Sequence, residues 1–373
     1  MKLWGGRILT LRHVWQRIRY FNQVFPLSSL LKDLFLLPWD YLRTGNRVET
    51  VRMVQIFVTT DCNQRCAMCY VHKEVGRSRH LPLECYRELV DALRDQRPCI
   101  LLMGGEPLMH PDLVEMVAYA KAAGCVTQTF TNGTLVRQET FDALVAAGLD
   151  YLNLSLLGTR ATHNAVAGIP RAYDLFLRNL EYLAPRRGKT QVVINFTLTP
   201  TTVSDAHHAF ELAARFGLDG VRLQHYMYLT PEESLAQEQV MSSLFGTTPE
   251  TQEIQTDAKE VIPFCEAVIR LRREVQVRYP HVSVQWAPTL SESEIRQWYG
   301  EIPFKTRRGC YFPWRGMLVN ADGVLYPCTK IFLELGRLDG RNPLDVWNAD
   351  DMLLFRQQLK KGLYPACSRC CKL

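Results

Sequence analysis

The chain reads VQIFVTTDCNQRCAMCY from residue 54 to residue 70. The first part of this stretch is an apolar, β-branched run that predicts a buried strand over Val54–Thr59. The second part places Cys62, Cys66 and Cys69 on one short loop directly after that strand, with the spacing C-x3-C-x2-C. Three thiolates on one loop can hold three irons of a [4Fe–4S] cluster and leave the fourth iron open. A structural zinc site needs four ligands, and no second close pair of cysteines lies nearby in the sequence.

Strand-like and helix-like segments alternate outward from this loop. Further strands are expected at Ile100–Met103, Val126–Phe130, Tyr151–Leu156, Val192–Leu198 and Val221–His225. Helical patterns lie between them, at about residues 82–95, 111–123, 138–147, 172–184 and 204–216. Repeated strand–helix units imply a parallel sheet with right-handed crossovers. We therefore expect an α/β fold, a partial (β/α)6 barrel of TIM type, with its active site at the carboxyl ends of the strands.

Over residues 51–225 these features resemble the radical SAM superfamily, whose members use S-adenosylmethionine (SAM). Gly104-Gly105-Glu106 follows the second expected strand and resembles the GGE motif of that family. The resemblance implies that SAM binds the open iron, and that its reductive cleavage yields a 5′-deoxyadenosyl radical that abstracts a substrate hydrogen. It also implies a set of SAM contacts, namely Tyr70, Gly104, Gly105, Glu106, Asn132, Ser155 and Asn195. The glycines would allow close backbone approach, and Glu106 would pair with the amino group of SAM.

A second group of cysteines lies in the last part of the sequence. Cys310 and Cys328 flank an expected hairpin, with strands near Gly316–Asn320 and Val324–Tyr326, and Cys367 and Cys370 form a close pair. Four thiolates suit either zinc or a fully ligated [4Fe–4S] cluster. The spacing resembles the twitch form of the SPASM module, which implies a second, auxiliary [4Fe–4S] cluster. Cys371 is an alternative ligand to Cys370.

The composition favours thiolate ligands over disulfide bonds. The chain has 12 cysteines in 373 residues, and its start lacks the apolar core and cleavage site of a signal peptide. We therefore expect a protein of the reducing cytoplasm. The basic residues concentrate before residue 49 and the remainder is nearly neutral, so no nucleic acid is expected as a partner.

Residues 1–50 are expected to form a separate, basic and amphipathic helical extension. Apolar and aromatic side chains recur at helical spacing between Leu11 and Phe25. Two interpretations remain open: a helical collar packed on the main domain or on a second subunit, and an element that lies on a membrane surface. The rest of the chain divides into the barrel (51–229), a helical connector that completes the side of the barrel (230–304) and the auxiliary-cluster domain (305–373).

The expected activity is the oxidation of a small-molecule natural-product precursor, with the auxiliary cluster as electron relay. Alternatives are the maturation of a ribosomal peptide and the modification of a lipid or isoprenoid at the membrane surface. A flavodoxin or ferredoxin is expected to supply the electron. His163 and Tyr226 are candidate catalytic bases, together with Arg160 and His225, because they follow the fourth and sixth expected strands.

Overall fold

The structure is a computed structural model. It describes residues 41, 46–69, 78–249, 254–255, 258–301 and 304–373. The expectations for the N-terminal extension and for Tyr70 therefore lie largely outside the described residues.

Within the described residues, one ten-stranded sheet has the order β12-β11-β10-β1-β2-β3-β4-β5-β6-β9. Its strands are β1 (Met53–Thr59), β2 (Cys99–Gly104), β3 (Val126–Thr131), β4 (Tyr151–Leu156), β5 (Gln191–Thr197), β6 (Gly220–Gln224), β9 (Val284–Ala287), β10 (Gly316–Val319), β11 (Val324–Tyr326) and β12 (Gly336–Arg337). The pairs from β10 through β1 to β9 are parallel, and β11 and β12 join antiparallel. The six strands expected from the sequence all form, in chain order.

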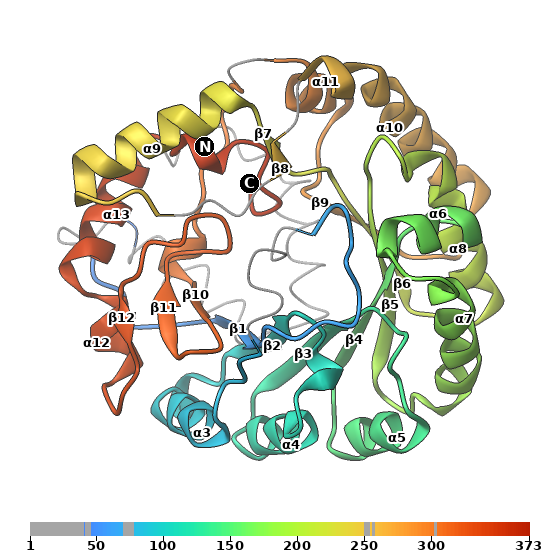
Figure 1. Ribbon diagram of the computed structural model, residues 1–373, viewed down its shortest axis with the longest axis horizontal. Coiled ribbons are helices and arrows are strands. Elements are labelled where there is room, and N and C mark those ends of the chain that lie inside the picture. The colour runs from blue at the N-terminus through green and yellow to red at the C-terminus, as the bar shows by residue number, and fades with distance from the viewer. Residues whose placement is uncertain (1–40, 42–45, 70–77, 250–253, 256–257, 302–303) are drawn as a thin grey trace, which may run out of the picture.

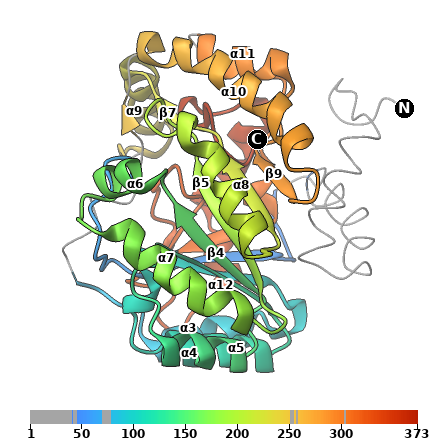
Figure 2. The same ribbon diagram turned by 90° about the vertical axis from the view of Figure 1, so that its right-hand side faces the viewer.

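Helices surround the outer face of this curved sheet (Figure 1). They are α3 (Leu83–Ala92), α4 (Leu113–Ala122), α5 (Gln138–Ala146), α6 (Arg160–Ala167), α7 (Ala172–Leu183), α8 (Ala206–Arg215), α9 (Pro231–Phe245), α10 (Ala258–Arg278), α11 (Glu292–Gly300), α12 (Pro343–Trp347) and α13 (Asp350–Lys361). Short 3-10 turns are η2 (Arg94–Gln96), η3 (Pro107–Met109), η4 (Ala184–Arg186), η5 (Val203–Asp205), η6 (Phe312–Trp314) and η7 (Pro365–Cys367). Figure 2 shows α7 and α8 covering the outer side of β4 and β5. The fold is therefore the expected partial barrel.

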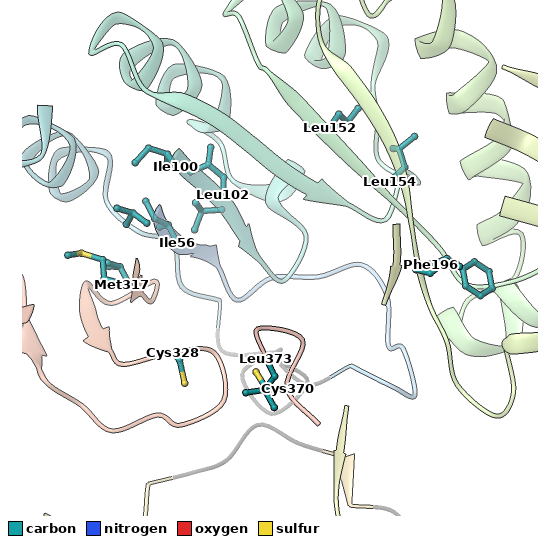
Figure 3. Packing of buried hydrophobic residues seen from close by; sticks show 14 of the residues in the cluster. Ile56, Ile100, Leu102, Leu152, Leu154, Phe196, Met317, Cys328, Cys370 and Leu373 are labelled. Carbon is teal, nitrogen blue, oxygen red and sulfur yellow. The ribbon is translucent and has the colours of Figure 1, made fainter. Parts of the chain in front are cut away.

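Alternation along each strand separates the helix-facing core from the barrel interior. On β5, Ile194 and Phe196 are fully buried in the main hydrophobic cluster, whereas Asn195 between them faces the interior. Figure 3 shows Ile56, Leu102, Leu154 and Phe196 from four strands on the core side. Polar side chains at the intervening positions are therefore available for chemistry inside the barrel.

Four strands extend the sheet beyond the six barrel strands: β9 at one edge, and β10, β11 and β12 at the other. β9 pairs in parallel with β6, although its segment lies in a region that the sequence predicts to be mostly helical. β10 pairs in parallel with β1, so the C-terminal hairpin continues the barrel sheet at its other edge. A separate short pair joins β7 (Tyr228–Leu229) to β8 (Ile254–Gln255). The four residues of β9 carry too little periodicity to be distinguished from helix by sequence alone. The hairpin strands β10 and β11 were expected from the sequence.

No helix among the described residues is both long enough and apolar enough to cross a membrane.

Candidate active site

The cysteine loop is attached at its start to the glycine-rich turn after β2. The Gly105 amide donates to the carbonyl of Thr59 (2.8 Å), and the Glu106 amide donates to the carbonyl of Asp61 (2.7 Å). A Cβ on Gly105 would lie 2.1 Å from the Asp61 carbonyl oxygen, and one on Gly104 would lie 2.5 Å from that of Thr59. The two glycines are therefore required because the two backbones touch.

The far end of the same loop is held by the C-terminal end of α6. The amides of Arg65 and Ala67 donate to the carbonyls of Ala167 and Val166, at 3.0 and 3.1 Å. Gly168 follows with a φ of +71°, and a Cβ there would lie 2.9 Å from the Arg65 carbonyl oxygen. The loop thus spans the barrel mouth from β1 to α6. The sequence did not identify Gly168 as part of the site, because a glycine after a helix is expected as a simple cap.

The Thr-Asn-Gly turn after β3 supports the middle of the loop. Asn132 Nδ2 donates to Asn63 Oδ1 (2.8 Å), and Asn63 Nδ2 donates to the Thr134 hydroxyl (2.9 Å). The Thr134 amide and hydroxyl both donate to Asn132 Oδ1, at 2.9 and 2.6 Å. Asn132 thus orients the cysteine loop. From the sequence, only a contact between Asn132 and SAM was expected.

The three thiols of the loop lie near one another. Burial raises the pKa of Cys62 to about 11 and that of Cys66 to about 12. Each of these two thiols also interacts electrostatically with Cys69. Such thiols stay protonated until a metal replaces the proton. Cys69 packs against the cluster that contains Phe57 and Tyr326, and Cys66 packs against the cluster that contains Val166 and Ala167 of α6.

Glu106 is a buried carboxyl group at the centre of this arrangement. Its Oε2 accepts from the Asn132 amide (2.7 Å) and its Oε1 accepts from the Leu108 amide (3.1 Å). Burial raises the pKa of Glu106 to about 7, and no cationic side chain among the described groups acts on it. A buried carboxyl group without a cation fits the amino group of a ligand such as SAM.

Ser155 and Asn195 lie side by side on β4 and β5, where they are register partners. Both face the barrel interior, and the buried Asn195 Oδ1 has no hydrogen-bond partner among the described residues. An unpaired buried acceptor favours a ligand that donates a hydrogen bond to it. The residues on this side of the barrel therefore fit a polar ligand such as SAM.

The C-terminal cysteines converge on a second site. Cys310 precedes η6, Cys328 follows β11, and Cys367, Cys370 and Cys371 lie in the final turn of the chain. Electrostatic interactions connect each of Cys310, Cys367 and Cys370 to other cysteines of the set. Figure 3 shows Cys328 and Cys370 on these two segments, with Leu373 beside Cys370. The fold thus brings together all four expected ligands and also Cys371.

Cys370 and Cys371 differ in their surroundings. A hydrogen bond between the two thiols lowers the pKa of Cys371 and raises that of Cys370. The positive charges of Lys372 and of Arg222 on β6 also lower the pKa of Cys371. Both cations belong to the barrel interior. Both thiols interact electrostatically with the rest of the set, since Cys371 acts on Cys310 and Cys310 acts on Cys370. The choice between Cys370 and Cys371 as the ligand stays open.

A buried cation accompanies the second site. Lys330 is 3% exposed, its amide donates to Cys328 Sγ (3.4 Å), and the charges of Cys370, Cys371 and Cys367 act on it. Burial lowers the pKa of Lys330 to about 8. Four thiolates around a cluster carry negative charge, which a buried ammonium group offsets. Sequence reasoning missed Lys330, because one lysine after a strand is an ordinary surface pattern.

The turn that carries Cys367 and Cys370 is fixed by the buried Arg369 between them. Its Nη1 contacts both Glu233 carboxylate oxygens, at 2.9 and 2.6 Å. Its Nε and Nη2 donate to the carbonyls of Trp298 and Glu301, at 2.8 and 3.0 Å. The connector helices α9 and α11 therefore hold the second cysteine site.

In the part of the chain that the structure describes, no three Cys, His, Asp or Glu side chains are grouped to hold one metal ion.

Three of the candidate catalytic bases, His163, His225 and Tyr226, are buried. His163 is fully buried; its Nδ1 accepts from the Leu157 amide (3.2 Å), and its ring contacts Tyr173 and Phe176. Burial lowers the pKa of His163 to about 4. These contacts pack α6 against its neighbours, and the assignment of His163 as a base stays a prediction.

The residues after β6 are held by α11. Tyr226 is 8% exposed, stacks on Tyr228, and its carbonyl accepts from Trp298 Nε1 (3.1 Å). His225 is fully buried, with Nδ1 at 2.9 Å from the Tyr299 hydroxyl, and burial lowers its pKa to about 3. Arg160 pairs with Asp174 on the outer surface. The assignment of Tyr226 as a base stays a prediction.

Comparisons with known proteins match both halves of this arrangement. The profile of the radical SAM superfamily matches residues 56–213. A second profile, SPASM, described as an iron–sulfur cluster-binding domain, matches residues 310–371. The two profiles therefore cover the first and second cysteine groups respectively.

Two of the similar proteins have names that refer to heme or to coproporphyrin, which are tetrapyrroles. The chain is 30% identical over 306 residues to an AdoMet-dependent heme synthase of Methanosarcina barkeri, covering 79% of this chain and 82% of that protein. It is 34% identical over 173 residues to an Fe-coproporphyrin III synthase of the same organism, covering 46% of this chain and only 43% of the relative. Among solved structures, Streptococcus suis SuiB bound to S-adenosylmethionine has a TM-score of 0.60 at 14% identity, over 91% of this chain and 79% of that one. At that identity the likeness concerns the fold.

Proposed function

Because the chain belongs to the radical SAM superfamily, we propose that it oxidises a small-molecule precursor by abstracting a hydrogen atom from it. The chain is an enzyme whose cofactors are SAM and [4Fe–4S] clusters at two sites. The observation that carries the proposal is the arrangement of both cysteine groups around one barrel interior. Relatives named as heme synthases favour a small molecule over a peptide as the substrate.

The first site would be formed by Cys62, Cys66 and Cys69. When bound, this cluster supplies the electron that cleaves SAM and so provides a 5′-deoxyadenosyl radical for hydrogen abstraction. Glu106 would accept hydrogen bonds from the amino group of SAM, and Ser155 and Asn195 would orient its polar groups. The glycine turn and the end of α6 keep the loop fixed across the barrel mouth.

The second site would use Cys310, Cys328, Cys367 and Cys370. A full set of four protein ligands leaves no iron open for substrate, which suits an electron acceptor. The substrate radical would lose one proton to a base or to water and one electron to this site, so that the net change is a dehydrogenation. Lys330 would offset the added negative charge. A flavodoxin or ferredoxin would supply the electron that initiates each turnover.

Anaerobic reconstitution with iron and sulfide, followed by SAM and dithionite, tests this function. We expect 5′-deoxyadenosine, measured by liquid chromatography and mass spectrometry. With substrate, we expect a product two mass units lighter, and tetrapyrroles are the first class to test. Fully loaded clusters that yield no 5′-deoxyadenosine would contradict the proposal.

A further inference from the structure

The barrel interior carries two cationic side chains between the two cysteine sites. Arg222 on β6 is a register partner of Asn195 on β5, which in turn pairs with Ser155 on β4. Lys372 approaches the same interior from the C-terminal turn, and its Nζ donates to Gln55 Oε1 on β1 (2.8 Å). Figure 1 shows this C-terminal segment inside the ring of strands and helices. Both cations act on Cys371, so they share one region.

Each cation lies against an aromatic ring. The Arg222 guanidinium carbon is 6.0 Å from the centroid of Phe130 on β3, and Lys372 Nζ is 3.4 Å from the centroid of Phe312. A guanidinium group stacked on a ring keeps its hydrogen-bonding edge available for a carboxylate. The two rings also offer apolar surface beside the charges.

Neither Arg222 nor Lys372 has an ion-pair partner among the described residues, whereas other buried cations are paired or hydrogen-bonded to carbonyl groups. The buried Arg369 pairs with Glu233, and the buried Arg356 donates to carbonyls of Pro313 and Trp347. By contrast, the ion pairs among the described residues include none for Arg222 or Lys372. Lys372 donates to the neutral Gln55 amide, which leaves its charge uncompensated. A partly buried cation that is not paired with an acidic group is stabilised when an anion binds beside it.

We propose that Arg222 and Lys372 bind a carboxylate group of the substrate inside the barrel. This inference rests on the proposed function and specifies its substrate class: a small molecule with a carboxylate on an apolar body that contacts Phe130 and Phe312. Arg222 forms the bidentate contact and Lys372 adds a second positive charge. The position on β6 beside Asn195 places this carboxylate next to the SAM side of the interior.

Two other anions compete for the same charges, and the experiment separates them. One is the carboxylate of SAM, and the other is the negative charge of the second cluster. Lys330 lies among the thiols of the second site, and Arg222 also acts on Cys371, so the potential of the second cluster is measured alongside substrate binding.

The test uses the reconstituted enzyme with both clusters in its wild-type form and as R222Q, R222K and K372Q. R215Q is the matched control, because Arg215 is an exposed arginine of the same barrel whose partner is Glu181. Fluorescence titration measures binding of coproporphyrin III, which carries carboxylates, and of its neutral methyl ester. Binding of SAM and the midpoint potential of the second cluster are measured on the same proteins.

We expect R222Q to weaken coproporphyrin III binding at least tenfold, which corresponds to about 1.4 kcal/mol. R222K should retain part of the affinity, K372Q should show a smaller loss, and R215Q should bind like the wild type. Both wild type and R222Q should bind the ester with equal affinity, more weakly than wild type binds the acid.

Several outcomes overturn the inference. The inference is wrong if R222Q binds coproporphyrin III as tightly as the wild type does, or if the wild type binds the methyl ester as tightly as the acid. It is also wrong if the wild type does not bind coproporphyrin III. A loss confined to SAM affinity would assign Arg222 to the carboxylate of SAM. A shifted cluster potential with unchanged porphyrin binding would assign it to the cluster. The proposed function is judged separately, by 5′-deoxyadenosine formation from SAM without any porphyrin.

Discussion

Glu106 combines two properties that make the first site sensitive to pH. It is buried, which raises the pKa of its carboxyl group to about 7, and its oxygens are held by backbone amides beside the cysteine loop. The carboxylate is ionised above that pKa and neutral below it. In the proposed role of Glu106, only the ionised form pairs with the amino group of SAM, so we expect SAM binding to depend on pH within the neutral range.

SAM affinity should therefore fall as the pH falls from 7.5 to 6. The decrease should approach roughly tenfold per pH unit below the pKa of Glu106, because the neutral fraction grows by that factor. Equilibrium binding of SAM to the reconstituted enzyme measures it. Glu106→Gln should bind SAM weakly at every pH in this range. An affinity of the wild type that stays constant between pH 6 and 7.5 would exclude Glu106 from the role.

Gly105 tests the contact between the glycine turn and the cysteine loop. Gly105→Ala would place a Cβ 2.1 Å from the backbone oxygen of Asp61, which has no flexible side chain to move away. The loop would have to shift, and we expect loss of the first cluster and of 5′-deoxyadenosine formation. Iron content should fall from about eight to about four atoms per chain.

Gly300→Ala is the matched control for that substitution. Nothing lies within 4 Å of a Cβ at Gly300, so this variant should keep its full iron content. Equal iron content in the two variants would show that the loop tolerates the displacement.

At the scale of elements, the connector between β6 and β10 holds the second cysteine site. α9 supplies Glu233 to Arg369, and Gln237 on the same helix accepts from the Ala366 amide (3.0 Å). α11 supplies the Trp298 carbonyl to the same arginine. The C-terminal turn is thus held in place by helices that lie far from it in the sequence.

Arg369→Gln should destabilise the protein by about 3–5 kcal/mol, because it leaves the buried Glu233 carboxylate unpaired. Denaturant unfolding measures this change, and the spectroscopic signature of the second cluster reports whether its ligand turn has moved. Arg369→Lys should restore part of the signature. Arg296→Gln removes an exposed partner of Glu266 and should change neither. A stable Arg369→Gln variant with an unaltered second cluster would contradict this role of the pair.

At the scale of the whole molecule, the sheet joins the two cysteine sites. β1 leads into the first loop and also pairs with β10 of the C-terminal hairpin. The first loop is held by β1, the turn after β2, the turn after β3 and α6, none of which carries a ligand of the second site. The two sites therefore lie on the same sheet, but different segments of the chain hold them in place.

Removing the second site should consequently spare the first. Cys310→Ala should lower the iron content to about four atoms per chain, while dithionite-driven 5′-deoxyadenosine formation without substrate continues. Substrate oxidation should stop, since the proposed electron acceptor is lost. Cys265→Ala is the control: this buried thiol lies on α10, where its Sγ contacts the Ile295 carbonyl (3.7 Å), and its loss should leave about eight irons. Iron content equal in both variants would refute the second site.

Local patterns in the sequence determined the barrel and most of the expected site residues. The alternation of buried strands and amphipathic helices is a local property, and so are the spacing C-x3-C-x2-C and the glycine turn after β2. These were enough to predict six parallel strands, the first cysteine loop and the hairpin between Cys310 and Cys328. They did not reveal β9, whose four residues carry no distinctive period.

Only the tertiary structure decided which residues from distant segments meet. Arg369 reaches Glu233 across 136 positions of the sequence, and Lys372 reaches Gln55 across 317. In the sequence, Arg222 is an ordinary charged residue in a strand. Its proposed role rests on its position beside Asn195 and on its contact with Phe130. Long-range contacts depend on how whole elements pack, whereas sequence patterns report the period and spacing within a single element.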